Sequence, residues 1–342
     1  MYTKSFPFTF LFLFLMFIGT MISLSSNHWL GVWIGLELNL MSFLPIMLGS
    51  GSLFESESAI KYFIIQALAS SAILMMSMAT FYTSSSWDIL LTQSEISSII
   101  FMILLLIKLG GVPFHFWLPN IAPSLSWSSC FLLLTWQKIA PMLLIVYMNN
   151  SPNHLLLLGA ISALVGSLGG INQTSLRILL TYSSISHTGW MICALLLDTS
   201  VFAIYLMTYL FLSSSIFLII SQDNTSSFTQ LNKKKVTNTS SIVLLTSLLS
   251  LGGLPPLMGF FPKLLVVLLM MQTNMYPCIL LLFTGSLISL YYYLNLSTLS
   301  MLSSSIQEVT HKSMKQLLVF SLSVVVNLLG SLLGIAILTF VV

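Results

Sequence analysis

One stretch of the sequence decides the fold: Lys108-Leu109-Gly110-Gly111-Val112-Pro113-Phe114-His115-Phe116-Trp117-Leu118-Pro119. The apolar run before it, 96–107, is too short to cross a bilayer, because a spanning helix needs roughly 20 residues. The span therefore has to continue through the glycines and Pro113, where a helix breaks or kinks. Unpaired backbone groups are tolerated at membrane depth only where protein or a water-filled cavity surrounds them, and here a lysine and a histidine flank the break. The stretch therefore predicts a discontinuous helix beside an ion pathway.

The composition places the rest of the chain in a membrane. Of its 342 residues, 57% are hydrophobic and 6% are charged, whereas soluble domains have about 25% charged residues. The first apolar run has the position of a signal peptide but lacks a small-residue cleavage site, so it is kept as a span. The apolar runs predict an all-helical, polytopic membrane protein with eleven spans, at about 6–24, 27–48, 59–82, 95–118, 125–147, 154–171, 174–197, 200–220, 240–270, 276–300 and 316–341.

The distribution of cations predicts the orientation, because short loops on the inner side of a membrane carry the excess of lysine and arginine. With the N-terminus inside, the outer loops hold no cation, and Glu55 and Glu57 belong to an inner loop. Three of the eleven cations fall within spans. The other cations all lie on the inner side: Lys4, Lys61, Arg177, Lys233, Lys234, Lys235, Lys312 and Lys315.

The glycine–proline motif occurs twice. Leu109-Gly110-Gly111-Val112-Pro113 in the fourth span recurs as Leu251-Gly252-Gly253-Leu254-Pro255 in the ninth. The two spans are an odd number of crossings apart, so they run in opposite directions, as in an inverted-topology repeat with two discontinuous helices. We therefore predict one transmembrane domain, 1–342, with repeat halves at about 6–150 and 154–300 and a terminal helix at 316–341. The breaks are predicted at Gly110 to Pro113 and near Gly252 to Pro256.

Four ionisable residues lie deep within spans: Glu37, Lys108, Lys138 and Lys263. A charge at the bilayer centre costs roughly 2.5–3.5 kcal/mol on insertion scales, so each residue needs a partner or must lose its charge. Because burial disfavours the charged form of both residue types, pairing and separating Glu37 and Lys108 would move protons. The alternative for Glu37 is a structural polar anchor, and the alternative for Lys263 is a side chain that extends to the membrane surface.

Several other residues are weaker candidates. His115 and His187 are possible secondary relays, and the alternative for each is an ordinary buried or interfacial side chain. Trp117 and the run Tyr291-Tyr292-Tyr293 lie near span ends and are expected to be interfacial aromatics.

The sequence predicts no metal and no redox cofactor bound by this chain. Its three cysteines, Cys130, Cys193 and Cys278, are scattered through apolar segments without the spacing of a zinc or iron–sulfur site. No glycine-rich nucleotide-binding motif and no Walker motif is present. Any energy must therefore arrive through a partner or an ion gradient.

Together the motifs resemble the family of subunit 2 of animal mitochondrial NADH:ubiquinone oxidoreductase, respiratory complex I. The resemblance rests on Trp-x-Gly-Leu-Glu ending at Glu37 and on the segments 108–117, 135–141, 172–177 and 250–263. It implies an antiporter-like proton-pumping subunit of the membrane arm, with no redox site of its own, in the mitochondrial inner membrane and with its N-terminus in the matrix. In that family an intramembrane glutamate and three lysines form the proposed proton route, and they match Glu37, Lys108, Lys138 and Lys263.

The resemblance also implies partners. These are the other membrane-arm subunits, including neighbouring antiporter-like subunits, and phospholipids such as cardiolipin, but no nucleic acid. NADH, FMN, iron–sulfur clusters and ubiquinone are expected in partner subunits, with electron transfer there coupled to pumping here. Two alternatives remain. A free-standing cation/proton antiporter would be stable and active alone, and a purely structural membrane subunit would pump normally after its buried lysines were replaced.

Overall fold

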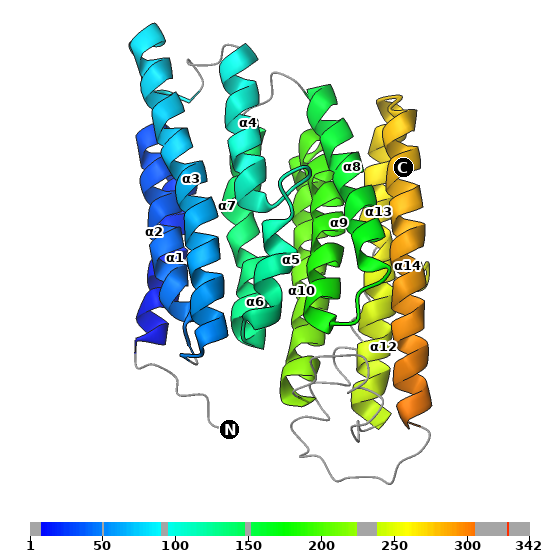
Figure 1. The fold of residues 1–342 in the computed structure, drawn as a ribbon. Coiled ribbons are helices and arrows are strands. Elements are labelled where there is room, and N and C mark those ends of the chain that lie inside the picture. The colour runs from blue at the N-terminus through cyan, green and yellow to red at the C-terminus, as the bar shows by residue number, and fades with distance from the viewer. Residues whose placement is uncertain are drawn as a thin grey trace. The chain divides into compact units, whose positions relative to one another are not determined.

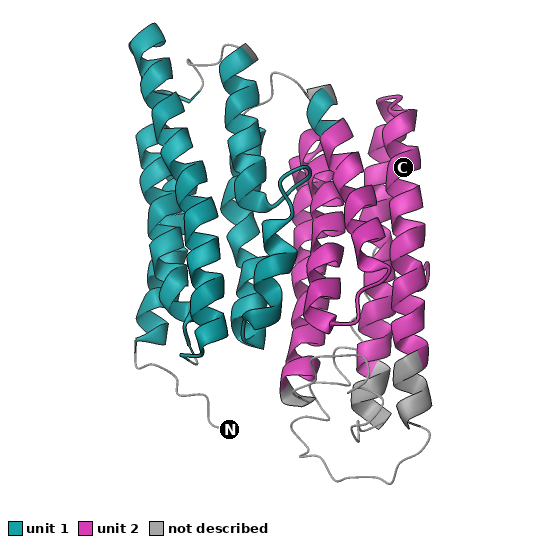
Figure 2. Cartoon of the chain, viewed as in Figure 1, with its two compact units in different colours: residues 1–156 teal, residues 157–342 magenta. Residues whose placement is uncertain are grey.

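The computed structural model describes residues 8–49, 51–89, 95–147, 152–223, 238–304 and 327. The chain divides into two compact units, residues 1–156 and 157–342, which Figure 2 shows in different colours. Helices make up most of the described residues, so the all-helical fold class is confirmed. Apart from Asn327, the terminal helix expected at 316–341 lies outside the described residues, as do the loop cations Lys4, Lys233, Lys234, Lys235, Lys312 and Lys315.

The first unit consists of antiparallel helices that pack along their lengths (Figure 1). Helix α2 packs against α1 and α3, α3 packs against α4, and α7 packs against α4 and α1. Small residues permit the closest of these approaches, since a Cβ atom on Gly19 of α1 would lie 2.9 Å from the carbonyl oxygen of Gly35 on α2. The elements of this unit are α1 (Thr9–Ser25), α2 (Trp29–Met47), α3 (Leu53–Ser84), α4 (Glu95–Leu109), α5 (Trp117–Ile121), the 3-10 helix η1 (Ala122–Ser124), α6 (Trp127–Leu134) and α7 (Trp136–Val146).

The predicted break in the fourth span is confirmed, because α4 ends at Leu109 and α5 begins at Trp117. Gly110 has a φ of +69°, a left-handed conformation that suits glycine. Trp117 Nε1 donates a hydrogen bond of 3.1 Å to the carbonyl of Ile107, which also accepts one of 3.2 Å from the backbone N–H of Gly110. Trp117 is buried. The expectation that it lies at the membrane interface was therefore wrong, because its indole closes the end of α4.

Gly110→Ala is expected to destabilise the protein more than Gly111→Ala. A Cβ atom on Gly110 would lie 2.2 Å from Leu118 Cδ1, and the positive φ adds strain, whereas a Cβ on Gly111 would meet only the side-chain end of Leu106, at 3.1 Å. Overpacking and left-handed strain each cost about 1–3 kcal/mol. Apparent melting temperatures in mild detergent measure the difference. Equal melting temperatures for the two variants would contradict this account of the break.

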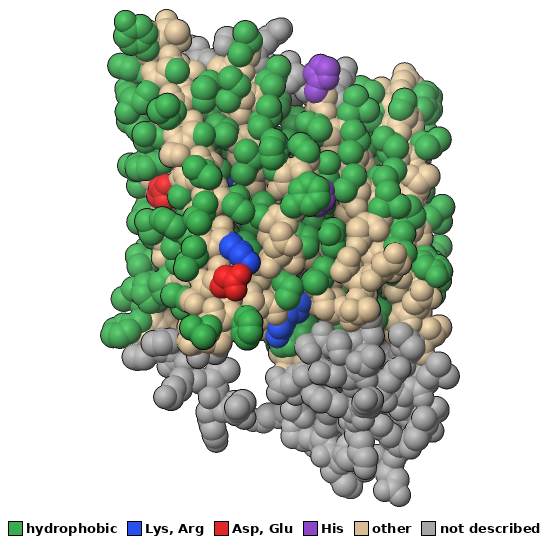
Figure 3. All heavy atoms as spheres, viewed as in Figure 1, with side chains coloured by type: hydrophobic (Ala, Val, Ile, Leu, Met, Phe, Trp, Pro, Cys, Tyr) green, Lys and Arg blue, Asp and Glu red, His purple; other side chains and the backbone are tan. Residues whose placement is uncertain are grey.

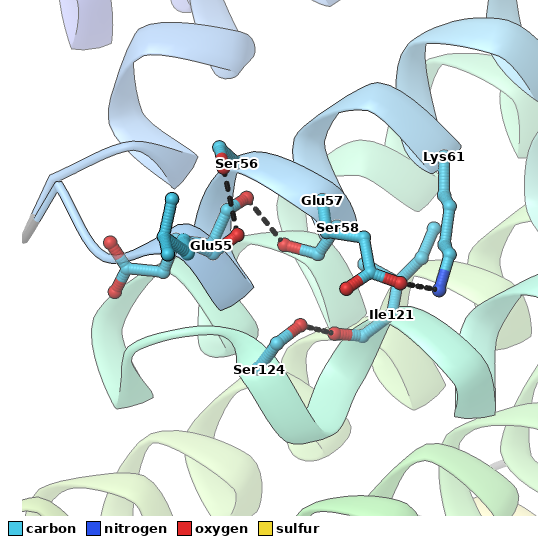
Figure 4. A network of polar contacts seen from close by, with 8 residues as sticks. Glu55, Ser56, Glu57, Ser58, Lys61, Ile121 and Ser124 are labelled. Carbon is cyan, nitrogen blue, oxygen red and sulfur yellow. Dashed lines mark hydrogen bonds and ion pairs between the residues drawn. The ribbon is translucent and has the colours of Figure 1, made fainter.

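Helix α3 begins earlier than the sequence suggested. Its first residue is Leu53, and the side chain of Ser52 caps it by accepting a hydrogen bond of 3.3 Å from the backbone N–H of Glu55. Glu55 and Glu57 therefore lie in helical turns and not in a loop, which corrects the prediction. Figure 4 shows Lys61 beside Glu57, where the two exposed side chains form an ion pair of 2.6 Å, and Ser58 donating to the carbonyl of Glu55. The side chain of Glu55 is buried.

The fifth span, predicted as continuous over 125–147, is interrupted. Helix α6 ends at Leu134 and α7 begins at Trp136, with Thr135 between them at φ −117° and ψ −72°. The Thr135 hydroxyl donates a hydrogen bond of 2.6 Å to the carbonyl of Phe131. Pro141 lacks an N–H and its ring opposes the carbonyl of Gln137, four residues earlier.

The second unit contains the second broken helix. Helix α12 ends at Gly252, Gly253 has a φ of +87°, and α13 begins at Phe260, so the break predicted near Gly252 to Pro256 is confirmed. Helix α9 packs against α10, α13 and α14, and α12 packs against α10 and α14. The elements of this unit are α8 (Pro152–Gly170, of which 152–156 belong to the first unit), α9 (Leu176–Leu197), α10 (Thr199–Asp223), α12 (Asn238–Gly252), α13 (Phe260–Gln272) and α14 (Tyr276–Ser304).

The described surface is that of a membrane protein. Hydrophobic side chains cover most of the face in Figure 3, and exposed examples include Phe10, Leu68 and Leu287. Among the described residues, five helical segments are long and apolar enough to cross a membrane, and five further apolar helices are shorter. The count of eleven spans, the inverted repeat and its halves stay predictions.

Candidate functional site

Lys108 lies at the end of the first half of the broken span. It occupies the last turn of α4, where the negative end of the helix dipole favours a cation. Its side chain is 6% exposed. Its carbonyl, which the break leaves without a helical partner, accepts a hydrogen bond of 3.2 Å from Gln66 Nε2 on α3. The break in α4 therefore fixes the position of Lys108 while keeping its side chain inside the unit.

Glu37 lies within electrostatic range of Lys108. It is half-buried on α2, and the Ser70 hydroxyl on α3 donates a hydrogen bond to its Oε1. The Glu37 carboxylate is close enough to Lys108 for the two charges to interact. The structure thus brings together the first two of the four predicted residues, each of which can stabilise the charge of the other.

Lys108 and Lys138 line the same small cavity of the first unit. Lys138 is 4% exposed on α7. The cavity offers about 20 Å³ for the centres of water molecules, and one water needs at least roughly 10–15 Å³. The space between the two lysines therefore suits about one ordered water. The polar residues of its wall, besides the two lysines, are Asn39, Tyr62, Gln66 and Gln137.

Hydrogen bonds join three of these wall residues. Gln137 Nε2 donates to Asn39 Oδ1 at 3.0 Å, and the Tyr62 hydroxyl donates to Gln137 Oε1 at 3.4 Å. Gln137 directly precedes Lys138, so this network holds the start of α7 against α2 and α3. The orientation of Lys138 toward the cavity depends on that contact.

His115 lies in the segment between α4 and α5. Its side chain is 6% exposed, its ring packs against Phe116, and its Nδ1 is buried without a hydrogen bond. It is not part of the wall that Lys108 and Lys138 share. The structure therefore does not bring His115 into contact with the cavity, and its role as a relay stays a prediction.

Lys263 lies at the second break, in the second unit. It is 8% exposed in the first turn of α13, and its Nζ donates to the carbonyls of Leu251 and Gly252, at 3.0 and 2.9 Å. These carbonyls end α12 and have no helical partner because the chain turns away at Gly253. The Trp190 ring lies 5.9 Å from the ammonium, within the range of a cation–π contact. Lys263 therefore does not extend to the membrane surface.

His187 joins the wall of a second small cavity, in the same unit as Lys263. Its Nδ1 lies 3.0 Å from the Tyr205 hydroxyl on α10, and its side chain is 6% exposed on α9. The cavity is also lined by Ser250 and by Leu251, whose carbonyl accepts a hydrogen bond from Lys263. His187 thus lines a cavity whose wall includes the residue that binds Lys263 through its carbonyl.

Sequence reasoning missed the polar residues that surround the charges. Tyr62, Gln66 and Ser70 follow one another at intervals of four on α3, so they share one face of that helix. A polar stripe at helical spacing in an otherwise apolar span was the signal that could have identified this wall.

Metal ligands do not cluster in the described part of the chain. Across those residues, no group of three or more His, Cys, Asp or Glu side chains is arranged to hold a metal ion. Cys130, Cys193 and Cys278 are buried. The absence of a redox cofactor from this chain stays a prediction.

Known proteins resemble this chain in sequence and in fold. The family model described as NADH:quinone oxidoreductase/Mrp antiporter, TM, matches residues 26–289. NADH-ubiquinone oxidoreductase chain 2 of Locusta migratoria is 39% identical over 84% of this chain and 83% of its own length. The protein of the same name from Anopheles gambiae is 40% identical over 84% of each chain.

Solved structures extend the comparison. A chain of respiratory complex I from Thermus thermophilus with bound aureothin superposes with a TM-score of 0.82 at 27% identity, covering 95% of this chain and 78% of that one. A chain of the Mrp complex from Dietzia superposes with a TM-score of 0.76 at 16% identity, covering 88% of this chain and 61% of that one. The second likeness concerns the fold alone.

Proposed function

Because the chain belongs to the NADH:quinone oxidoreductase/Mrp antiporter membrane family, with chain 2 proteins of NADH-ubiquinone oxidoreductase among its relatives, we propose that it carries protons in the membrane arm of that enzyme. The enzyme's electron transfer from NADH to ubiquinone takes place in partner subunits. This chain binds no NADH, FMN, iron–sulfur cluster or ubiquinone itself. Its contribution is a set of buried groups that exchange protons when the electrons move.

One observation carries the proposal: two buried lysines, Lys108 and Lys138, line the same small polar cavity. Buried ammonium groups are costly unless they have partners or water. Lys108 has Glu37 as a partner, and the cavity gives Lys138 a polar wall and room for water. A proton that leaves Lys108 therefore has a short route to Lys138.

The carboxylate of Glu37 controls the first step of this route. While it lies beside Lys108 it stabilises the ammonium form, and Ser70 holds it there by donating to its Oε1. When Glu37 moves away or takes up a proton, the ammonium of Lys108 loses that stabilisation. Lys108 then releases its proton into the cavity, where neutral Lys138 accepts it.

Lys263 and His187 are the proton-exchanging groups of the second unit. Lys263 is held by two backbone carbonyls, which stabilise its ammonium form without a carboxylate. His187 lines the cavity whose wall includes Leu251, and its imidazole can accept a proton on one nitrogen and release one from the other. His115 is kept as a secondary relay. Glu37, Lys108, Lys138 and Lys263 are then the main proton carriers, the first three in the first unit and Lys263 in the second.

The location and the partners follow from the same proposal. The chain is a multi-pass protein of the mitochondrial inner membrane, with its N-terminus in the matrix, where the predicted inner-loop cations also lie. Its partners are the other membrane-arm subunits, including neighbouring antiporter-like subunits, together with phospholipids such as cardiolipin. Nucleic acid is not a partner.

Lys138→Met tests the route at its centre. The substitution keeps most of the side-chain volume and deletes the charge, so NADH-driven proton translocation in sealed vesicles is expected to fall by about tenfold or more. Lys61→Met is the matched control, because Lys61 is half-exposed and pairs only with Glu57 at the start of α3.

The same measurement separates the alternatives. Normal pumping by an assembled Lys138→Met complex would favour a purely structural membrane subunit. Ion exchange by the purified chain alone, without its partner subunits, would instead identify a free-standing cation/proton antiporter.

A further inference from the structure

Two tyrosines of α14 have buried hydroxyl groups that the proposed route does not use. Tyr292 and Tyr293 are 3% and 0% exposed, and neither phenolic oxygen makes a hydrogen bond of ordinary geometry. Both are expected near the membrane interface, and the structure shows that they face the interior of the unit and not the lipid. Burying a hydroxyl without a partner costs a few kcal/mol, so a native protein rarely keeps two such groups side by side without a use.

The neighbours of these hydroxyls are themselves polar. The phenols of Tyr292 and Tyr293 interact with each other, and they also reach the hydroxyls of Ser186 and Ser183 on α9, respectively. Each serine donates to a carbonyl of its own helix, so its oxygen keeps lone pairs that can accept. Neither contact has the geometry of a direct hydrogen bond, and a small side-chain movement or an intervening water would complete it.

Tyr205 extends the group to the cavity of the second unit. Its buried phenol lies 3.0 Å from Nδ1 of His187 and is within electrostatic range of Tyr293. The ring of Tyr293 in turn packs against Gly252, whose carbonyl accepts a hydrogen bond from Lys263. His187 and Tyr205 line the cavity together with Leu251, the residue whose carbonyl holds Lys263. A series of hydroxyls from α9, α10 and α14 therefore begins at the cavity that Leu251 lines. We call Tyr205, Tyr292, Tyr293, Ser183 and Ser186 the tyrosine ladder.

The other end of the tyrosine ladder reaches the surface. The ring of Tyr292 packs against Gly170, the last residue of α8, where a Cβ atom would lie 3.0 Å from the Cε1 of Tyr292. The next two residues, Ile171 and Asn172, are exposed in the turn between α8 and α9. Only the thickness of this turn separates the buried phenol from the outside of the unit.

We propose that the tyrosine ladder is a proton-uptake branch that joins the α8–α9 turn to His187 and Lys263. A neutral hydroxyl can accept a proton on its oxygen while donating its own proton to the next acceptor, so the chain passes one proton without ionising any phenol. Water at the turn gives a proton to the Tyr292 oxygen, and Tyr292 passes its own hydroxyl proton to Tyr293. Tyr293 passes a proton to Tyr205 in the same way, and Tyr205 passes one to His187. Each hydroxyl ends with one proton and rotates back. With the predicted orientation, the turn faces the matrix.

The branch rests on the proposed function, and its test separates the two. In the assembled enzyme, Tyr293→Phe and Tyr292→Phe each remove one hydroxyl and keep the ring. Tyr291→Phe is the matched control, because Tyr291 is 57% exposed on the same helix. We expect NADH-driven proton translocation to fall by about fivefold in each buried variant relative to the control, as the loss of one relaying hydrogen bond predicts.

The melting temperature of each variant distinguishes a relay role of the phenols from a structural role. Removing an unpartnered buried hydroxyl should leave the melting temperature of the enzyme unchanged or raise it, whereas a structural role for the phenols would lower it. Pumping at the Tyr291→Phe level in both buried variants overturns the branch if Lys263→Met, measured in parallel, has lost pumping. If Lys263→Met also pumps fully, the proposed function itself fails.

Ordered water provides a second measurement that needs no variant. A high-resolution map of the native enzyme is expected to show water bonded to the phenols of Tyr292 and Tyr293, or direct bonds from them to Ser186 and Ser183. Phenols that pack against apolar side chains without water would overturn the branch. Because this map is of the native enzyme, the measurement also decides the question if the variants fail to assemble.

Discussion

Lys108→Met is expected to reduce NADH-driven proton translocation to the background level while the enzyme still assembles. Methionine fills most of the lysine volume, and Trp117 still closes the end of α4 through its hydrogen bond to Ile107, so the break keeps its shape. The substitution removes the charge that interacts with Glu37, and it replaces the ammonium group that lines the cavity shared with Lys138 by an apolar group. The proton-to-electron ratio in sealed vesicles measures the loss. Lys61→Met, at an exposed site, is again the control.

Glu37→Gln completes the test, because the two residues are proposed to act as a pair. Groups that interact directly show non-additive effects, so the double variant should lose little more than Lys108→Met alone. Full pumping by assembled Lys108→Met and Glu37→Gln enzymes would refute the route. Additive losses would refute the pairing but leave two independent proton carriers.

The parts of the fold that were predictable from the sequence are those that depend on local chemistry. Gly110 and Pro113, and likewise Gly253 and the prolines after it, interrupt a helix whatever surrounds them, and both breaks lie where the motif indicated. The buried charges were also predictable, since the side chain of a lysine flanked by long apolar runs cannot reach the membrane surface and has to lie inside the protein. Lys138 is buried for that reason.

The surroundings of the charges could not be predicted, because they depend on which helix faces lie together. The network from Asn39 to Gln137 joins positions 98 residues apart, and no local pattern specifies that pairing. Tyr292 and Tyr293 were assigned to the interface by their distance from a span end. Helix α14 runs on to Ser304 and packs against α9 and α12, which turns both phenols inward.

The two breaks differ in the groups that stabilise the ammonium form of their lysines. At the first break, a tryptophan indole donates a second hydrogen bond to the Ile107 carbonyl at the end of α4, and the lysine has a carboxylate within electrostatic range. At the second break, the lysine itself takes up the free carbonyls of α12. The ammonium form of Lys263 is therefore stabilised by backbone geometry, so a change in that geometry should alter proton exchange without touching a titratable group.

Gly253→Ala is expected to have that effect and to reduce proton translocation nearly as far as Lys263→Met. The new Cβ would lie 2.9 Å from Lys263 Nζ, and the φ of +87° is one that alanine rarely adopts. Either the ammonium or the turn has to move, and both movements break the bonds to the carbonyls of Leu251 and Gly252. The measurement is the proton-to-electron ratio of the assembled enzyme.

Gly252→Ala is the matched control for the backbone. Its Cβ would make an ordinary contact of 3.6 Å with Tyr293, and the residue lies within the helical range of α12. It is expected to lose far less pumping than its neighbour. Equal ratios for the two alanine variants would contradict the role of the carbonyls. A loss in Gly253→Ala alone would indicate that the break in α12 determines when Lys263 holds its proton.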